Sequence, residues 1–117
     1  MAESEENPHR KNKRHRVSWA TRLLFPNKQI VPARTKDVSA GGVGFEYEQK
    51  LAVGQEVSIE LSPWMSGKQY TIRAKGVVTY NMIMSGNNGF SHGLKFTMIP
   101  KKQFEQLAEI LKSLEQS

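Results

Sequence analysis

Six short segments in which apolar and polar side chains alternate restrict the possible fold of this chain more than any other feature. In residues 56–61, for example, Val57, Ile59 and Leu61 lie on one side, and this period of two is typical of a half-buried strand. The other segments of this kind are residues 17–23, 29–39, 43–47, 70–80 and 92–98. Pro32 predicts an edge or a bulge in the segment that contains it. The sequence therefore predicts a mainly β protein, a small six-stranded antiparallel β-barrel.

The pattern changes after Pro100 to the period of a helix. Phe104, Leu107, Leu111 and Leu114 follow one another at intervals of three, four and three residues, so they share one helical face. Pro100 suits the first position of such a helix, where the backbone N–H has no partner within the helix. We expect this C-terminal α-helix to close one end of the barrel with its apolar face rather than to expose that face to a partner.

Length and composition narrow the class of protein. The 117 residues suit one domain. The absence of cysteine excludes a disulfide framework, a thiol nucleophile and a thiolate metal site. No apolar run approaches the ~20 residues that cross a bilayer, and the acidic and then basic N-terminus is unlike a signal peptide. The sequence predicts a cytoplasmic protein without membrane insertion.

The basic residues cluster near the N-terminus. The net charge is +6, and five of the seven residues from Arg10 to Arg16 are Arg or Lys. Because this segment has almost no apolar side chain to bury, we expect residues 1–16 to form a flexible basic arm before a barrel-and-helix domain at residues 17–117. A basic arm is often only a solvated tail, but it can also fold over an anionic ligand and act as a switch.

Two short motifs indicate a nucleotide as that ligand. They are Arg10-x-x-x-Arg14 in the arm and Asp37-x-Ser39-x-x-Gly42 after the second predicted strand. Guanidinium groups suit phosphate oxygens and the O6/N7 edge of guanine, whereas a carboxylate suits the N1–H and N2–H donors of that base. A hydroxyl can join the same network, and glycine lets a ligand approach the backbone. Together the motifs predict a pocket for a guanine nucleotide. Taken alone, the second motif is a weak signal, because Asp and Ser are ordinary turn residues that can cap a turn with a local hydrogen bond.

The order and spacing of these motifs around a first strand resemble the PilZ family of cyclic di-GMP receptors. The segment His92-Gly93-Leu94-Lys95-Phe96 is similar to the family's closing Gly-x-x-Phe strand, so the resemblance extends over roughly residues 10–114. It implies a six-stranded barrel with helical additions and cyclic di-GMP as the ligand. The residues that it implies as ligand contacts are Arg10, Arg14, Asp37, Ser39 and Gly42, with Gly93 on the far wall of the pocket.

One question of register stays open in the arm. In many family members the second motif arginine directly precedes the first strand. That position here belongs to Arg16, whose partner four residues earlier is Asn12. We predict that Arg10 and Arg14 form the motif and that Arg16 adds a further ligand contact.

The sequence favours a binding protein over an enzyme. His9, His15 and His92 lack the spacing of metal ligands, and no P-loop or Rossmann signature is present. We therefore predict no metal site and no cofactor. The main hypothesis is a single-domain cyclic di-GMP receptor whose arm changes conformation and signals to an unidentified protein partner. The resemblance implies a role in bacterial motility, exopolysaccharide production or biofilm formation.

Two alternatives come from other classes of protein. A small basic β-barrel could bind single-stranded nucleic acid through its arm and exposed aromatic side chains. Aromatic residues make up only 9% of the chain, so nucleic acid is the less favoured partner. A protein with this fold could also have lost the ligand and serve as a scaffold, but the presence of Asp37, Ser39 and Gly42 argues against that.

Overall fold

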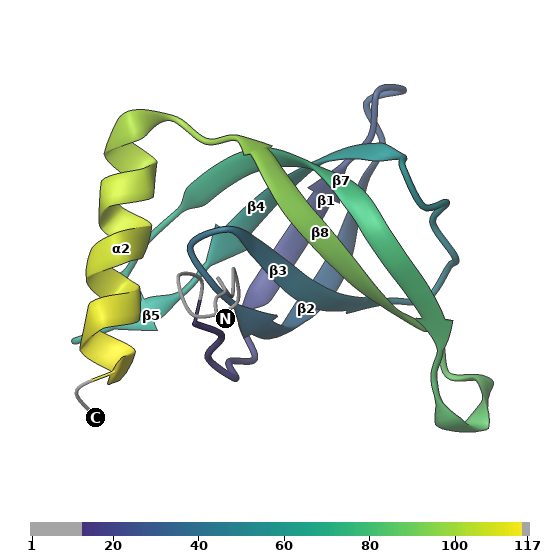
Figure 1. Ribbon diagram of the computed structural model, residues 1–117, viewed down its shortest axis with the longest axis horizontal. Helices are drawn as coiled ribbons and strands as arrows, with labels where there is room; N and C mark the ends of the chain where they lie inside the picture. The colour runs from purple at the N-terminus through teal and green to yellow at the C-terminus, as the bar shows by residue number, and fades with distance from the viewer. Residues whose placement is uncertain (1–12, 116–117) are drawn as a thin grey trace, which may run out of the picture.

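A computed structural model describes residues 13–115 of the protein. Within these residues, six antiparallel strands close into one barrel, which confirms the predicted fold (Figure 1). The strands are β1 (Ala20–Leu24), β2 (Ile30–Val38), β3 (Gly42–Tyr47), β4 (Glu56–Ser62), β7 (Ile72–Ile83) and β8 (Phe90–Met98). Around the barrel they follow the order β1-β2-β3-β8-β7-β4. The long hairpin of β7 and β8 therefore lies between β3 and β4.

Side chains that alternate between apolar and polar in the sequence alternate between core and surface in the barrel. In β1 the side chains of Thr21 and Leu23 are buried while those of Ala20 and Arg22 are exposed, and in β3 Val43 and Phe45 face the core. Full burial of one large apolar side chain contributes about 1.5–3 kcal/mol. Because a one-residue slip would turn a whole strand inside out, this pattern also determines how the strands pair.

Three register shifts interrupt the barrel strands. One lies between Lys75 and Gly76 where β7 pairs with β8, and the other two set the direction of side chains on the outer surface. The register shifts in β2 between Thr35 and Asp37, and in β7 between Val78 and Tyr80. Thr35 and Val78 are buried in the core, but the extra residue in each bulge reverses the direction of the side chains that follow. Asp37 and Tyr80 therefore point outward. The bulge in β2 lies at Lys36, not at the proline where the sequence suggested an edge or a bulge.

A histidine lies inside the barrel. His92 is fully buried in β8, and its ring stacks on Phe45 with the centroids 5.0 Å apart. Its Nε2 atom accepts a hydrogen bond from the Leu51 N–H at 3.1 Å. Burial lowers the pKa of His92, and the nearby Phe90 backbone opposes this shift only in part. The other ring nitrogen, Nδ1, makes no hydrogen bond of normal geometry to any described residue. His92 is thus a neutral core residue that also holds Leu51 in place.

The C-terminal helix α2 (Lys101–Glu115) packs beside β7, at the end of the barrel away from the turn that joins β7 to β8 (Figure 1). Leu107 and Leu111 are buried as predicted, together with Ile110. The expectation for Phe104 was wrong, because this side chain is 41% exposed. In the first turn the side facing β7 belongs to Gln103 instead, whose Oε1 atom accepts a hydrogen bond from the Arg73 N–H.

A small hairpin was not anticipated from the sequence. It consists of β5 (Trp64–Met65) and β6 (Lys68–Gln69), and both residues of its turn, Ser66 and Gly67, have positive φ angles. Such paired positive angles are typical of two-residue hairpin turns. The turn between β7 and β8 contains a short 3-10 helix, η1 (Ser85–Asn87). Among residues 13–115, no helix has the length and apolar character to cross a membrane.

Candidate functional site

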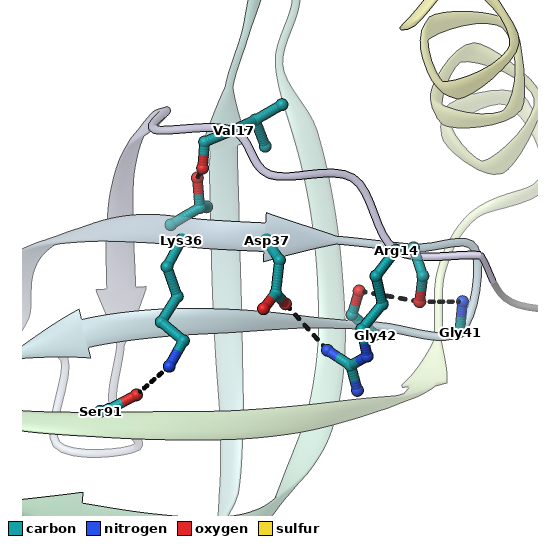
Figure 2. A network of polar contacts seen from close by, with 9 residues as sticks. Arg14, Val17, Lys36, Asp37, Gly41, Gly42 and Ser91 are labelled. Carbon is teal, nitrogen blue, oxygen red and sulfur yellow. Dashed lines mark hydrogen bonds and ion pairs between the residues drawn. The ribbon is translucent and has the colours of Figure 1, made fainter. Parts of the chain in front are cut away.

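Asp37 lies on the outer face of the barrel and receives an arginine from the arm. An oxygen of its carboxylate, Oδ1, accepts a hydrogen bond from Arg14 Nη1 at 2.8 Å, and the two groups form an ion pair (Figure 2). The Arg14 side chain is 53% exposed and that of Asp37 is 20% exposed. The structure therefore brings together two residues that lie 23 positions apart, one from each predicted motif.

The end of the arm is held against β2 by its backbone. The His15 N–H donates to the Val38 carbonyl and the Val38 N–H donates to the His15 carbonyl, both at 2.9 Å. This isolated antiparallel bridge places Arg14 over the end of β2, within reach of Asp37. In the described part of the chain, these two hydrogen bonds and the ion pair are the polar contacts that connect residues 13–15 to β2.

Two glycines face each other beside the carboxylate. Gly44 in β3 pairs with Asp37 on one side and with Gly93 in β8 on the other, and Gly93 pairs with Tyr80 in β7. A Cβ atom on Gly44 would lie 2.7 Å from Asp37 Oδ1, and one on Gly93 would lie 2.4 Å from Tyr80 Cε2. Asp37 and Tyr80 therefore lean toward each other over bare backbone. The four residues form one row across β2, β3, β8 and β7, with the carboxylate at one end, the two glycines in the middle and the aromatic ring at the other end.

The turn between β2 and β3 uses the other two motif residues. Ser39 is buried, and its Oγ atom accepts a hydrogen bond from the Gly41 N–H at 3.2 Å and donates to the Gly42 carbonyl at 3.4 Å (Figure 2). A Cβ atom on Gly42 would lie 2.3 Å from the Leu94 carbonyl oxygen. In the structure Ser39 thus caps the turn, and Gly42 lets β3 approach β8.

Further cationic side chains border this surface. Lys36, the extra residue of the β2 bulge, reaches across β3 and donates from Nζ to Ser91 Oγ in β8 at 2.6 Å (Figure 2). Arg16 is exposed at the edge of the same area. A shallow depression of about 340 Å³ is lined by Arg16, Val17, Ser18, Thr35, Lys36 and Glu46. Arg16 and Lys36 in this lining would attract the anionic groups of a ligand, and Glu46 would oppose them in part.

The predicted site residues thus have different places. Arg14 and Asp37 meet, while Arg16 lies at the depression beside them. Ser39 and Gly42 form the adjoining turn, and Gly93 lies two strands from Asp37. Arg10 lies outside the described residues.

Sequence reasoning missed Lys36, Gly44 and Tyr80. A glycine inside a predicted strand is a known sign of close approach by another group, and this signal could have identified Gly44. Nothing local marks Tyr80, because its orientation depends on a bulge. Among residues 13–115, no group of three or more acidic, histidine or cysteine side chains could hold a metal ion.

Comparisons with known proteins agree with this fold. The PilZ domain family model matches residues 8–113. The structure of Bacillus subtilis inhibitor of motility (MotI/DgrA) is similar, with a TM-score of 0.76 and 14% identity over 90% of this chain and 51% of that chain. The PilZ domain of Escherichia coli YcgR with c-di-GMP has a TM-score of 0.64 and 19% identity over 91% of each chain. A search of curated proteins finds no match.

A third similar structure is the K. pneumonia MrkH–c-di-GMP complex, with a TM-score of 0.68 and 15% identity over 89% of this chain and 51% of that chain. The chain spans about half the length of MotI and of MrkH. Because the family model covers most of the sequence, the chain belongs to the PilZ domain family.

Proposed function

We propose that this protein is a receptor for cyclic di-GMP, which binds on the outer face of the barrel around Asp37. The observation that carries the proposal is the meeting of Arg14 with Asp37, beside two glycines and among lysine and arginine side chains. Family membership supports it, as do structures with this fold that contain c-di-GMP. The receptor would act in the bacterial cytoplasm.

The residue types on this face match the chemistry of the ligand. Cyclic di-GMP carries two phosphates and two guanines, so its receptor needs fixed positive charge and acceptors for base donors. Asp37 accepts the N1–H and N2–H donors of one guanine, while Arg10 and Arg14 contact phosphate or the O6/N7 edge. Arg16 supplies a further cation. Ser39, Gly42 and Gly93 shape the backbone against which the ligand lies.

Binding exchanges the partner of Asp37. In the structure this carboxylate is paired with Arg14, and a guanine edge placed on Asp37 would compete for the same oxygen. The displaced guanidinium group is then free to bind a phosphate or the base, because its five donors suit either. The arm thereby changes its contacts on ligand binding and offers a partner protein a new composite surface.

Calorimetric titration with cyclic di-GMP tests the receptor assignment directly. We expect binding in the micromolar range or tighter, and much weaker binding of cyclic di-AMP and of GTP. Adenine presents a donor where guanine has the O6 acceptor, so arginine groups directed at O6/N7 would be mismatched. Equal affinity for the adenine analogue would contradict the proposal. The titration also gives the number of ligand molecules bound.

Salt dependence separates this proposal from nucleic-acid binding. A ligand with two phosphates can release about two counterions, whereas an arm on a single strand neutralises several phosphates, with a slope of about −0.7 per contact. We expect affinity for cyclic di-GMP to fall gently with salt. Micromolar binding of single-stranded DNA or RNA at physiological salt, with a log–log slope steeper than about −3, would favour the nucleic-acid alternative.

A further inference from the structure

We propose that Tyr80 is a ligand-binding residue, and that its ring is the surface on which a guanine of the ligand stacks. This inference rests on the proposed function, since it assigns a further residue to the same site. Tyr80 belongs to neither motif and lies in β7, on the side of the two glycines opposite Asp37.

The backbone of β7 is built to present this ring to the outside. Val78 pairs with Leu94, and both side chains are buried in the core. In a regular strand, Tyr80 would point the same way as Val78, because side chains two residues apart share a face. The bulge between Val78 and Tyr80 breaks this rule and turns Tyr80 outward, opposite Gly93. Bulges are common next to functional sites because they redirect a side chain.

The same device directs Asp37 on the other side of the site. The bulge at Lys36 in β2 turns Asp37 out of the core direction taken by Thr35 and places it opposite Gly44. Two strands that flank the glycine pair therefore each carry a bulge, and each bulge directs one functional side chain onto a glycine. A single bulge could be incidental, but the paired arrangement indicates a surface made by both strands.

Glycine at position 93 is what allows the ring to lie against the sheet. A Cβ atom there would lie 2.4 Å from Tyr80 Cε2 and 2.6 Å from Cδ2. The ring edge thus occupies the space where the side chain of Gly93 would be. Tyr80 remains only half-buried, and its hydroxyl has no hydrogen-bond partner among residues 13–115.

The spacing across the site suits a base. Asp37 leans over β3 and Tyr80 leans over β8, which are neighbouring strands. Neighbouring strands lie about 4.8 Å apart, so a base that lies over the two glycines would be within reach of both side chains. Aromatic stacking tolerates any base, because every base has a flat π-face. Tyr80 therefore contributes affinity, while discrimination between guanine and adenine comes from Asp37 and the arginines.

Three substitutions at one position test this role. Tyr80→Leu keeps an apolar side chain over Gly93 but removes the aromatic ring, and we expect it to weaken cyclic di-GMP binding by about five- to 150-fold. Tyr80→Phe keeps the ring and should bind like the wild type. Tyr80→Ala should bind as weakly as the leucine variant or more weakly. Thermal unfolding of each variant reports whether the barrel is intact.

Tyr70→Ala is the matched control, because Tyr70 is also a half-buried tyrosine but lies next to the β5–β6 hairpin. Lys68 Nζ lies over its ring, 5.2 Å from the centroid. This variant should keep wild-type affinity. A direct signature is also available: stacking on an aromatic ring shifts the guanine H8 resonance of the bound ligand upfield, and this shift should be lost in Tyr80→Leu and kept in Tyr80→Phe.

Two failures can be told apart. If the wild-type protein does not bind cyclic di-GMP, the receptor assignment is wrong and this inference falls with it. If the wild type binds and Tyr80→Leu binds equally well, the receptor assignment stands and only the role of Tyr80 is wrong. Weak binding by Tyr80→Phe with an intact barrel would also overturn stacking, because it would assign the effect to the hydroxyl.

Discussion

Two carboxylates on the outside of this barrel are held by arginine, but the arginines come from different places. Glu60 in β4 lies between its direct cross-strand neighbours, Arg22 in β1 and Arg73 in β7. Arg22 Nε donates to Glu60 Oε1 at 2.9 Å and Arg73 Nε donates to Oε2 at 2.8 Å. Asp37 instead receives Arg14 from a segment that lies outside the six barrel strands. Strand register fixes the first cluster, which is Glu60 with Arg22 and Arg73. It does not fix the second cluster, which is Asp37 with Arg14.

The two carboxylates also differ in how many of their oxygen atoms accept hydrogen bonds. Both oxygens of Glu60 accept hydrogen bonds, and its side chain is 7% exposed. Burial acts to raise the pKa of Glu60, but hydrogen bonds and charges from Arg73 and Arg22 outweigh it and hold the pKa below its usual value. Asp37 is more exposed, and among residues 13–115 only its Oδ1 atom has a partner. The hydrogen-bonding capacity of Glu60 is therefore used within the fold, whereas Oδ2 of Asp37 is open to the ligand that we propose.

The largest difference between the clusters should appear in ligand binding. Arg14→Ala and Asp37→Ala should each weaken cyclic di-GMP binding by about 1 to 3 kcal/mol, roughly five-fold to more than a hundred-fold, because each removes a charge-assisted hydrogen bond to the ligand. Arg22→Ala is the matched control and should leave affinity unchanged. Calorimetry measures all three. If Arg14→Ala bound normally while Arg16→Ala did not, our register for the arginine motif would be wrong.

The reverse difference should appear in stability. Glu60→Ala leaves Arg22 and Arg73 without their shared carboxylate, and we expect it to lower the free energy of unfolding by about 2 kcal/mol. Asp37→Ala should cost less than about 1 kcal/mol, because its partner is half exposed to solvent. Urea unfolding of both variants measures the two costs. Equal costs would contradict the distinction between a structural and a functional cluster.

The sequence predicted the parts of this fold that depend on local pattern. The period of two identified the six barrel strands, because burial of alternate side chains is required wherever one face of a sheet meets a core. The spacing of the two motifs also identified Arg14 and Asp37, which the structure brings together. The role of Gly42 was harder to predict. Because Gly42 has no side chain, β3 can lie close to the Leu94 carbonyl of β8. The glycine that lies beneath Asp37 is Gly44 instead.

The bulges explain what the sequence could not show. Counting in steps of two from Thr35 puts Asp37 inside the barrel, and counting from Val78 puts Tyr80 inside as well. Both face outward, because an extra residue is accommodated opposite β3 and β8. Where a strand absorbs an extra residue depends on its pairing partners, not on its own sequence. A site on the outer face was therefore predictable only in part.

Acid should remove the contribution of Glu60 to stability. The pKa of Glu60 is lowered in the folded state, so below the usual value of about 4.5 the unfolded chain binds more protons than the folded chain. The free energy of unfolding therefore falls there as pH falls, by at most about 1.4 kcal/mol per pH unit. The stability difference between wild type and Glu60→Gln should be constant above about pH 5 and shrink through and below 4.5. Urea unfolding at several pH values measures it.

His92 provides an internal check on that experiment. Its pKa is also lowered, so the wild type should begin to lose stability as pH falls below the usual histidine value of about 6.5. Both proteins contain His92, and this loss cancels in their difference. A stability difference that already shrinks between pH 6.5 and 5 would mean that Glu60 is not the group responsible.

The smallest effect concerns the attachment of the arm without ligand. The Arg14–Asp37 pair is exposed enough that a double-mutant cycle on stability should give only about 0.2–1 kcal/mol. Within residues 13–16, the described part of the arm, the His15–Val38 bridge adds to it. The His15 N–H should therefore exchange readily with solvent in the absence of cyclic di-GMP and become protected when the ligand bridges arm and barrel. The Thr35 N–H, which donates to the Trp19 carbonyl at 3.1 Å, is the control and should change little. If the His15 amide is as protected as the barrel strands before ligand is added, or stays unprotected at saturation, the arm is not a switch, even if the receptor assignment holds.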